Sequence, residues 1–523
     1  MNDLLGVVDW SRAQFAMTAM YHWLFVPLTI GLSLIVAIME SIYVRTGDTR
    51  WRNITKFWMT LFGINFACGV ATGIILEFEF GTNWSNYSWF VGDIFGAPLA
   101  IEGIVAFFME ATFVAVMFFG WNKVSRRFHL ASTWLTAIGV SLSALWILVA
   151  NAWMQNPAGM TFDPAQMRNV MTDFWAVAFN PVSMNKFFHA VTSGWALAGA
   201  FVLAVSCWLL ARGRNAETAR KSIRIGGWVG TAGLLLTCWT GHGSAVQVAR
   251  VQPMKLAAME GLYTGGNGVP LVAFGILNSP EAIAAGADPM KFSIDIPYGL
   301  SLMIDGSTTS YVPGIEDLLA GRERSGGEQP AMAPSYSQRM EMGVLARQAL
   351  TRYSQAREAG DSTAMAEAEA DISTYFPNFG YGYLESPDDA VPPVGLTFYS
   401  FHVMVLGAGL LVVLFATLLF AAIRKPALLG YRWMHWLGFL SLVVVYLVSQ
   451  AGWIVAEVGR QPWVIQNLMP TGAAISDISS ASVQTTFWIF AVVFTGLLVA
   501  EISIMTRYIS KASRSDIETA KHV

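Results

Sequence analysis

Charged residues are scarce in this sequence. Asp, Glu, Lys and Arg make up 13% of the 523 residues, whereas a soluble globular chain carries about 25%. Hydrophobic residues reach 54% and the mean hydropathy is +0.48. This composition excludes an ordinary soluble protein and predicts that lipid surrounds much of the chain. The net charge is only −3, which argues against nucleic acid as a partner.

Cysteine is also rare, and Cys68, Cys207 and Cys238 all lie inside apolar stretches. They form no set of pairs, no C-x-x-C motif and no C-x-x-C-H motif. The sequence therefore excludes a disulfide framework and covalent attachment of haem. The first residues, MNDLLGVVDWSRAQF, lack the basic start and the cleavage site of a signal peptide. We expect the first apolar stretch to be retained as a helix.

Long apolar stretches, by contrast, are abundant. A helix needs about 20 apolar residues to cross the hydrocarbon core of a membrane. The sequence therefore predicts an all-α fold, a polytopic membrane bundle of about nine transmembrane helices. The predicted spans are 22–44, 54–79, 97–121, 130–151, 187–211, 225–247, 396–423, 433–456 and 484–507.

Lysine and arginine gather in alternate connections between these spans. The connections after the first, third, fifth and seventh spans, and the segment after the ninth, are basic, whereas 81–96, 152–186 and 457–483 are poor in both residues. Cytoplasmic loops are enriched in Lys and Arg. The pattern therefore predicts an N-terminus outside the membrane and a C-terminus in the cytoplasm.

The connection between the sixth and seventh spans differs from the others. Residues 248–395 are too long and too polar for a turn, so we predict an extracytoplasmic domain there. It divides the chain into a first bundle of six spans (1–247) and a second bundle of three spans with a cytoplasmic tail (396–523). Within it, 335–372 reads as a solvated helix of mixed charge. The domain is either a solvated lid or a substrate-binding module.

Several side chains that bind metals fall inside or beside the predicted spans. His22, His189, His402, Met404 and Glu457 all lie toward the outer side. Such residues are costly in a membrane and usually face a cavity, a partner or a cofactor. A layer of His, Met and carboxylate suggests haem ligation, because His/Met is a known low-spin arrangement. Each residue also has a simpler interpretation, as a hydrogen bond between helices or as core filling.

Carboxylates and one arginine form two further groups. Glu102 and Glu110 lie about 12 Å apart along the third span and form either a proton relay or a helix-packing pair. In GWIVAEVGRQPW (452–463), Glu457 and Arg460 are three residues apart, on neighbouring positions of a helix. Arg460 either holds an anionic group, for which its planar fork is suited, or caps the helix in a simple ion pair.

Six segments, in order, resemble subunit I of cytochrome bd-type quinol oxidases. They cover nearly all of the membrane part of the chain. The segments are SRAQFAMTAMYHWLFVPLTIG (11–31), EFEFGTNWSNYSWFVGDIFGAPLAIEG (77–103), FFMEATF (107–113), KFFHAVTSGW (186–195), QPMKLAAMEG (252–261) and GWIVAEVGRQPW (452–463).

The resemblance implies two haem b and one haem d, or a third haem b in place of haem d. His22 would be the axial ligand of the O2-reactive haem d, and Glu457 would ligate the high-spin haem b. His189 and Met404 would be the axial ligands of the low-spin haem b. One departure is His402, where the family often has Arg, and this makes His402 a rival ligand to Met404.

The resemblance also assigns roles around the haems. Lys255 and Glu260 match quinol-site residues, while Glu102 and Glu110 match carboxylates of the proton and haem-environment network. Further matches are Ser143 in the proton path and Trp453 and Arg460 in contact with haem.

The implied function is a terminal oxidase of a bacterial cytoplasmic membrane, which oxidises quinol and reduces O2 to water. Opposite-side proton release and uptake would generate a proton motive force without pumping. The implied partners are a second polytopic subunit and a small single-span subunit. The alternatives are a haem b electron-transfer subunit, a related oxidase lacking haem d, and a transporter without haem.

Overall fold

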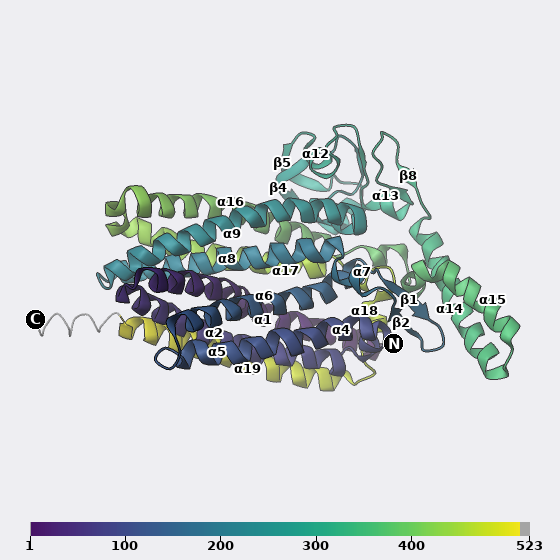
Figure 1. Ribbon diagram of the computed structural model, residues 1–523. Helices are drawn as coiled ribbons and strands as arrows, with labels where there is room; N and C mark the ends of the chain where they lie inside the picture. Colours follow the sequence, from purple (N-terminus) through teal and green to yellow (C-terminus); the bar gives the residue numbers. More distant parts are fainter. Residues whose placement is uncertain (1, 513–523) are drawn as a thin grey trace, which may run out of the picture.

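The computed structural model describes residues 2–512 and is mostly helical. The predicted all-α membrane bundle is confirmed, since eight helices in this range are long and apolar enough to cross a membrane. Long helices lie nearly parallel along one axis (Figure 1). They are α1 (Asn2–Thr46), α2 (Thr49–Thr82), α4 (Asp93–Ile101) continuing through η1 (Glu102–Phe107) and α5 (Phe108–Phe119), α6 (Arg126–Gln155), α8 (Pro181–Ala211), α16 (Val394–Arg424), α17 (Arg432–Val458) and α19 (Ser480–Ala512).

A further long helix, α9 (Ala216–Val251), corresponds to the predicted sixth span but does not reach the same apolarity. It packs along α8, where small residues let the two backbones approach closely. A Cβ placed on Gly199 of α8 would lie 2.4 Å from the Cα of Gly230 and 2.8 Å from the carbonyl oxygen of Gly226. Close packing of small residues is a usual way to join helices in membranes. The count of nine spans stays a prediction.

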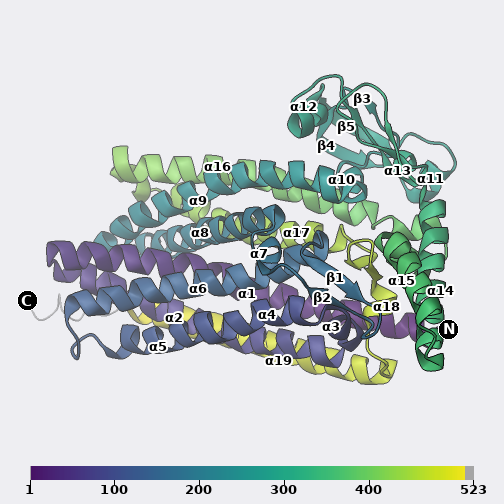
Figure 2. The same ribbon diagram turned by 45° about the vertical axis from the view of Figure 1, so that its right-hand side comes forward.

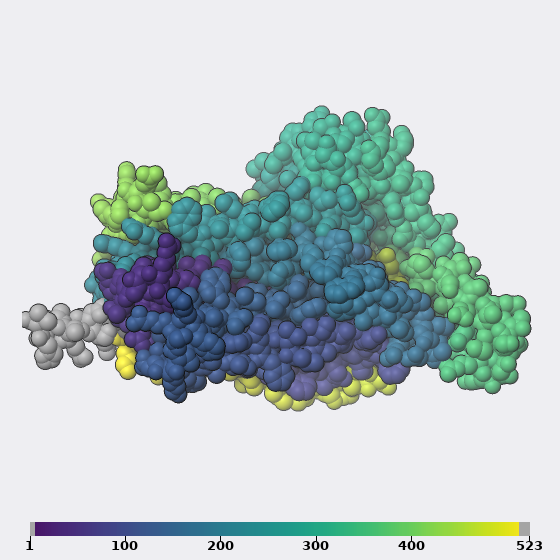
Figure 3. Space-filling view, viewed as in Figure 1, coloured from purple at the N-terminus to yellow at the C-terminus, as the bar shows by residue number. Residues whose placement is uncertain are grey.

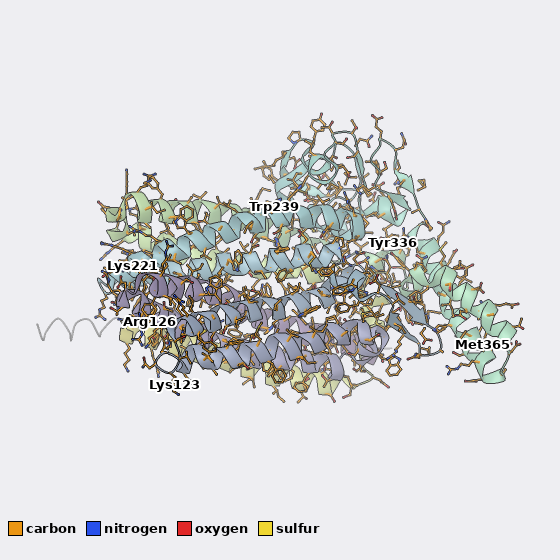
Figure 4. The ribbon with its side chains drawn as sticks, viewed as in Figure 1. Lys123, Arg126, Lys221, Trp239, Tyr336 and Met365 are labelled. Carbon is orange, nitrogen blue, oxygen red and sulfur yellow. The ribbon has the colours of Figure 1, made fainter. Side chains whose placement is uncertain are left out.

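The basic connections gather at one end of the bundle. Lys123, Arg126 and Lys221 lie at that end, whereas Tyr336 and Met365 of the long connection lie at or beyond the other (Figure 4). We call the end near Tyr336 the outer end and the opposite one the inner end. Short elements cover the outer end: α3 (Ser85–Val91), β1 (Met160–Asp163), β2 (Arg168–Met171), α7 (Phe174–Ala178), β9 (Trp463–Ile465), β10 (Met469–Pro470) and α18 (Thr471–Ala474).

The connection between α9 and α16 forms two parts. The first lies beside the outer half of α9 and α16, and the second is a pair of helices across the outer end (Figures 1 and 2). Both protrude from the bundle (Figure 3). The elements are α10 (Pro253–Glu260), β3 (Gly266–Asn267), β4 (Leu271–Leu277), α11 (Pro280–Ala284), β5 (Met290–Ile296), α12 (Gly299–Asp305), β6 (Tyr311–Val312), α13 (Ile315–Leu319), β7 (Arg322–Glu323), β8 (Ala331–Met332), α14 (Tyr336–Ala359), α15 (Ser362–Tyr375), η2 (Phe376–Tyr383) and η3 (Pro387–Ala390).

Two segments predicted from the sequence differ from the helices in the structure. The first span was placed at 22–44, but α1 begins at Asn2, so His22 lies near the middle of this helix. The early turns are held by packing, for example of Trp10 against Phe487 of α19, with ring centroids 5.3 Å apart. The solvated helix predicted over 335–372 is two helices, since Gly360 ends α14 with a positive φ of 70°.

The three-domain division stays a prediction. The helix ends lie near its boundaries, because α9 ends at Val251 and α16 begins at Val394. The short helix η4 (Pro426–Gly430) joins α16 to α17 at the inner end. The predicted cytoplasmic tail beyond residue 512 lies outside the described residues.

Replacing Gly199 with Leu should lower the thermal unfolding temperature of the purified protein in detergent. Overpacking a core typically costs about 1–3 kcal/mol, and here the added carbons would meet the backbone of α9. The matched control is Gly409→Leu on α16, where an added Cβ meets nothing within 4 Å. Equal losses of stability in the two variants would contradict this account of the contact between α8 and α9.

Candidate functional site

Two adjoining cavities lie among α1, α2, α6 and α17. One has a volume of about 450 Å³ and is lined by Glu457 and Arg460, and the other, of about 420 Å³, is lined by His22, Glu102 and Glu110. The two cavities share part of their lining. The shared residues are Phe15, Ala19, Phe80, Met154, Trp453 and Arg460.

His22 is held in a state that suits a metal ligand. Its Nδ1 lies 2.9 Å from Oγ1 of Thr72. The Thr72 hydroxyl donates its own hydrogen to backbone carbonyls of α2, at 3.0 Å from that of Cys68 and 3.0 Å from that of Gly69. With its hydrogen directed at those carbonyls, the Thr72 oxygen accepts from Nδ1–H, and this tautomer leaves the lone pair of Nε2 for a ligand. Gly73 makes room for the ring, since a Cβ there would lie 3.0 Å from Cε1 of His22.

His189 on α8 has the same arrangement. Its Nδ1 lies 3.1 Å from Oγ1 of Thr240 on α9, and the Thr240 hydroxyl donates to the carbonyl of Leu236 at 2.9 Å. Nδ1–H is therefore the donor, and the Nε2 lone pair is left for a ligand. A Cβ on Gly241 would lie 3.4 Å from the Cε1 of His189, so a glycine again faces the ring.

Met404 lies on α16 against α17. A Cβ on Gly452 would lie 3.0 Å from its sulfur atom, so this side chain also faces a glycine. Helices α8, α9, α16 and α17 pack as one group, which carries both His189 and Met404. His402, the rival ligand, has its Nδ1 2.8 Å from the Phe398 carbonyl oxygen and its Nε2 2.9 Å from that of Val272. Both of its ring nitrogens therefore contact backbone oxygens, and the role of Met404 as a ligand stays a prediction.

Glu457 at the outer end of α17 belongs to a buried charge network. Its Oε2 lies 2.6 Å from Nη2 of Arg460, and its Oε1 accepts from Nδ2 of Asn151 at 3.1 Å. The Nζ of Lys186 donates to Oδ1 of Asn151 at 2.6 Å, and that of Lys255 donates to the Ala456 carbonyl at 2.8 Å. Three basic side chains thus lie around one carboxylate, and the planar fork of Arg460 suits an anionic group on a ligand.

Sequence reasoning missed Lys186 and Asn151. Lys186 lies three residues before His189, nearly one helical turn, inside a segment already singled out. That spacing was the available signal for Lys186. One nitrogen of Arg460 is left unpaired in this network. Its Nε is buried and has no hydrogen-bond partner in residues 2–512. A carboxylate on a bound ligand would satisfy it.

The predicted proton-path residues come together at the second cavity. Ser143 on α6 donates to Oε1 of Glu102 at 2.6 Å. Glu110 is buried against Gly139, where a Cβ would lie 3.0 Å from its Cγ, and its Oε1 has no partner in the described part of the chain. Between the two carboxylates the helix widens into a π-helical turn, Glu102–Phe107. Such turns are frequent at functional sites.

Lys255 and Glu260 lie on the short helix α10 and are 5% and 2% exposed. Burial, together with the nearby charge of Lys186, holds the pKa of Lys255 well below its usual value. Burial also raises the pKa of Glu260 to about 8. Neither Glu260 oxygen has a hydrogen-bond partner among the residues described. A carboxyl group in this state can take up or release a proton near neutral pH.

Residues 10–513 match the family model described as cytochrome bd terminal oxidase subunit I. The chain belongs to the cytochrome bd terminal oxidase subunit I family. It is 41% identical over 514 residues to the cytochrome bd-II ubiquinol oxidase subunit 1 of Escherichia coli, with 96% of each chain covered. It is 32% identical over 508 residues to the cytochrome bd ubiquinol oxidase subunit 1 of Bacillus subtilis, with 97% of this chain and 94% of that one covered.

The fold agrees with a solved structure. The bd oxidase of Geobacillus thermodenitrificans matches 98% of this chain and 100% of its own, with a TM-score of 0.78 and 23% identity. The predicted family is thus confirmed, and cytochrome bd subunits of this kind are haem proteins. The roles of individual residues stay predictions, as does the haem set.

Replacing Thr240 with Val should weaken haem binding at His189, because the ring would lose the acceptor that fixes its tautomer. Loss of such an outer partner typically costs about 10–100-fold in metal affinity. The measurement is the haem-to-protein ratio and the reduced-minus-oxidised spectrum of the purified complex. Thr231→Val is the matched control on α9, since the Thr231 hydroxyl has no partner in residues 2–512. Equal haem loss in both variants would contradict the role of Thr240.

Proposed function

We propose a specific haem and quinol arrangement for this terminal oxidase subunit. As a cytochrome bd subunit the chain is part of a quinol:O2 oxidoreductase that reduces O2 to water. The observation that carries the arrangement is the environment of His22 and His189. In each, Nδ1 lies next to a threonine hydroxyl that donates its own hydrogen to a backbone carbonyl, so that Nε2 is left for a ligand. The cation network beside Glu457 supports it, because haem propionates are anions.

Four residues would hold the iron atoms. His22 would bind haem d, or a third haem b in its place, and Glu457 would bind the high-spin haem b. His189 and Met404 would bind the low-spin haem b. When bound, these groups store electrons and offer an open iron position to O2. Arg460 and the indole of Trp453, which line both cavities, would contact the haem edges. Trp453 stacks on Trp23, with ring centroids 5.2 Å apart, and is thereby held in place.

Quinol binds at α10, where its oxidation releases protons on the outer side. The Glu260 carboxylate accepts a proton from the quinol hydroxyl, and Lys255 supplies a hydrogen-bond donor and charge compensation. The two electrons of the quinol would pass to the low-spin haem b that His189 and Met404 would hold. Glu110, Ser143 and Glu102 carry protons from the inner side to the second cavity. Because protons are released outside and taken up from inside, charge is separated without a pump.

The N-terminus lies outside a bacterial cytoplasmic membrane and the C-terminus in the cytoplasm, because the basic connections gather at the inner end. A second polytopic subunit and a small single-span subunit accompany the chain. Apolar side chains with high exposure on η1, α5 and α19 offer surfaces for them or for lipid, for example Phe108 (66%) and Val492 (71%).

The first test is a dithionite-reduced minus air-oxidised absorbance spectrum of the purified complex, followed by CO. We expect b-type bands together with a far-red chlorin band that shifts with CO. Only b-type bands with CO binding would indicate a third haem b at His22. A lack of CO binding would favour an electron-transfer subunit, and the absence of haem bands would contradict the arrangement.

Replacing Glu260 with Gln should remove most quinol oxidation and leave the haem spectra intact, because the amide cannot accept the quinol proton. General-base groups typically contribute about 10²–10⁴-fold to a rate. Loss of the haem spectra in this variant, or full quinol oxidation, would contradict the assigned role.

The pH profile of the unmodified enzyme gives a further prediction. Since the pKa of Glu260 is raised to about 8, only about one carboxyl in ten is ionised at pH 7. We expect kcat/KM for quinol to rise with pH, to reach half of its plateau near pH 8 and to level off above about pH 9. A profile that is flat between pH 6 and 8 would argue against Glu260 as the base.

A further inference from the structure

His402 joins the membrane bundle to the external connection. It lies on α16 and is 6% exposed. Its Nε2 is 2.9 Å from the carbonyl oxygen of Val272, which belongs to β4 and lies 130 residues earlier in the chain. Its Nδ1 also lies 2.8 Å from a carbonyl oxygen, that of Phe398. Carbonyl oxygens can only accept, so the tautomer with a hydrogen on Nε2 donates to Val272. The bond attaches β4 to α16 at a buried position.

Val272 is also the neighbour of Glu260. The backbone amide of Val272 lies close enough to the Glu260 carboxyl to favour its charged form, against the effect of burial. Val272 thus accepts a hydrogen bond from His402 through its carbonyl group, while its amide lies near the Glu260 carboxyl without a hydrogen bond to it.

Gly261, the residue after Glu260, is closely packed against β4, β5 and α16. A Cβ on Gly261 would lie 2.8 Å from Cε of Met290, 2.9 Å from Cδ2 of Leu277 and 3.2 Å from Cδ2 of Phe398. Helix α10, the β4–β5 hairpin and α16 therefore meet directly beside Glu260. Phe398 also packs on the His402 ring, with centroids 4.1 Å apart.

The strand is irregular where His402 binds it. Val272 pairs with Asp295 and Phe274 pairs with Ile294, so Ala273 is an extra residue on β4. A bulge of this kind disrupts the ladder locally and redirects backbone groups, and bulges are frequent next to active sites. At this bulge, the carbonyl group of Val272 meets a side chain of α16.

We propose that His402 is a positioning residue of the quinol site. Its hydrogen bond to the Val272 carbonyl fixes β4 on α16 and thereby holds the β4–β5 hairpin, which packs on Gly261, beside Glu260. The proposal rests on the proposed function, in which Glu260 takes the quinol proton. It gives His402 a role in quinol binding and none in haem ligation.

Tyr399 provides a matched control on the same helix. Its hydroxyl oxygen accepts from the backbone amide of Leu277 at 3.1 Å, at the other end of β4. Tyr399→Phe removes an attachment between β4 and α16 without touching Val272. Gln at position 402 carries two N–H donors on one nitrogen and can donate to backbone carbonyls as His does. Leu at that position has no donor.

The experiment uses the complete oxidase complex with ubiquinol-1 as the quinol. We expect His402→Leu to raise KM about three- to tenfold, the factor that corresponds to one lost hydrogen bond. His402→Gln and Tyr399→Phe should stay within about twofold of the unmodified enzyme. O2 consumption driven by reduced tetramethylphenylenediamine, a soluble one-electron donor, should be unchanged in all three variants, as should the reduced haem spectrum.

Two outcomes would overturn the proposal. One is an unchanged KM for ubiquinol-1 in His402→Leu. The other is a loss of the low-spin haem band or of diamine-driven activity, which would assign His402 to the haem. If the Leu variant does not assemble, His402→Asn, with a shorter side chain, takes its place under the same criteria.

Glu260→Gln, measured in parallel, separates failure of this inference from failure of the proposed function. Lost ubiquinol-1 oxidation in Glu260→Gln with a normal KM in His402→Leu rejects only the role of His402. Full oxidation in Glu260→Gln rejects the role of Glu260 and, with it, the basis of the inference.

Discussion

A charge inside a membrane protein needs a partner, because removing it from water costs several kcal/mol. The arrangement at the outer end of the bundle follows from this constraint. Glu457 is shared between Arg460 and Asn151, while Lys186 reaches Asn151 and Lys255 reaches the carbonyl of Ala456. These contacts join α6, α8, α10 and α17, and Arg460 among them lines both cavities. The same network therefore connects four helices at the outer end of the bundle and places Arg460 where it can bind an anionic group of a ligand.

A second constraint concerns the two histidines with a free Nε2. A neutral imidazole can carry its proton on either nitrogen, and only one tautomer offers Nε2 to a metal. At His22 and at His189 the choice is made by a threonine whose hydroxyl is already bonded to its own helix. A neighbouring glycine then gives the ring its space. The tautomer of each ring is thus set by one neighbouring threonine, and the same arrangement occurs at two separate places in the bundle.

The sequence was most informative where a single helix decides the outcome. Apolar length predicted the eight helices that are long and apolar enough to span a membrane. Residue type and depth singled out His22, His189, Met404 and Glu457, whose roles as ligands stay predictions. The sequence was least informative where distant segments meet. Nothing around His402 indicates that a strand 130 residues earlier would bind its ring. The apolar window also missed the first turns of α1, because packing against α19 rather than hydropathy holds them.

The π-helical turn at Glu102–Phe107 has a geometric consequence for the whole third span. In a continuous α-helix, residues eight apart are separated by about 80° around the axis. A wide turn accommodates roughly one additional residue and so reduces this rotation by about 100°, which brings Glu102 and Glu110 to nearly the same side, where both line one cavity. Deleting one residue within this turn would leave the two carboxylates seven residues apart in a regular helix, about 20° short of two full turns, and so still on the same side. Converting the wide turn to a regular α-helix without a deletion would instead separate them by about 80°. The wide turn therefore compensates for the eight-residue spacing and lets both carboxylates line one cavity.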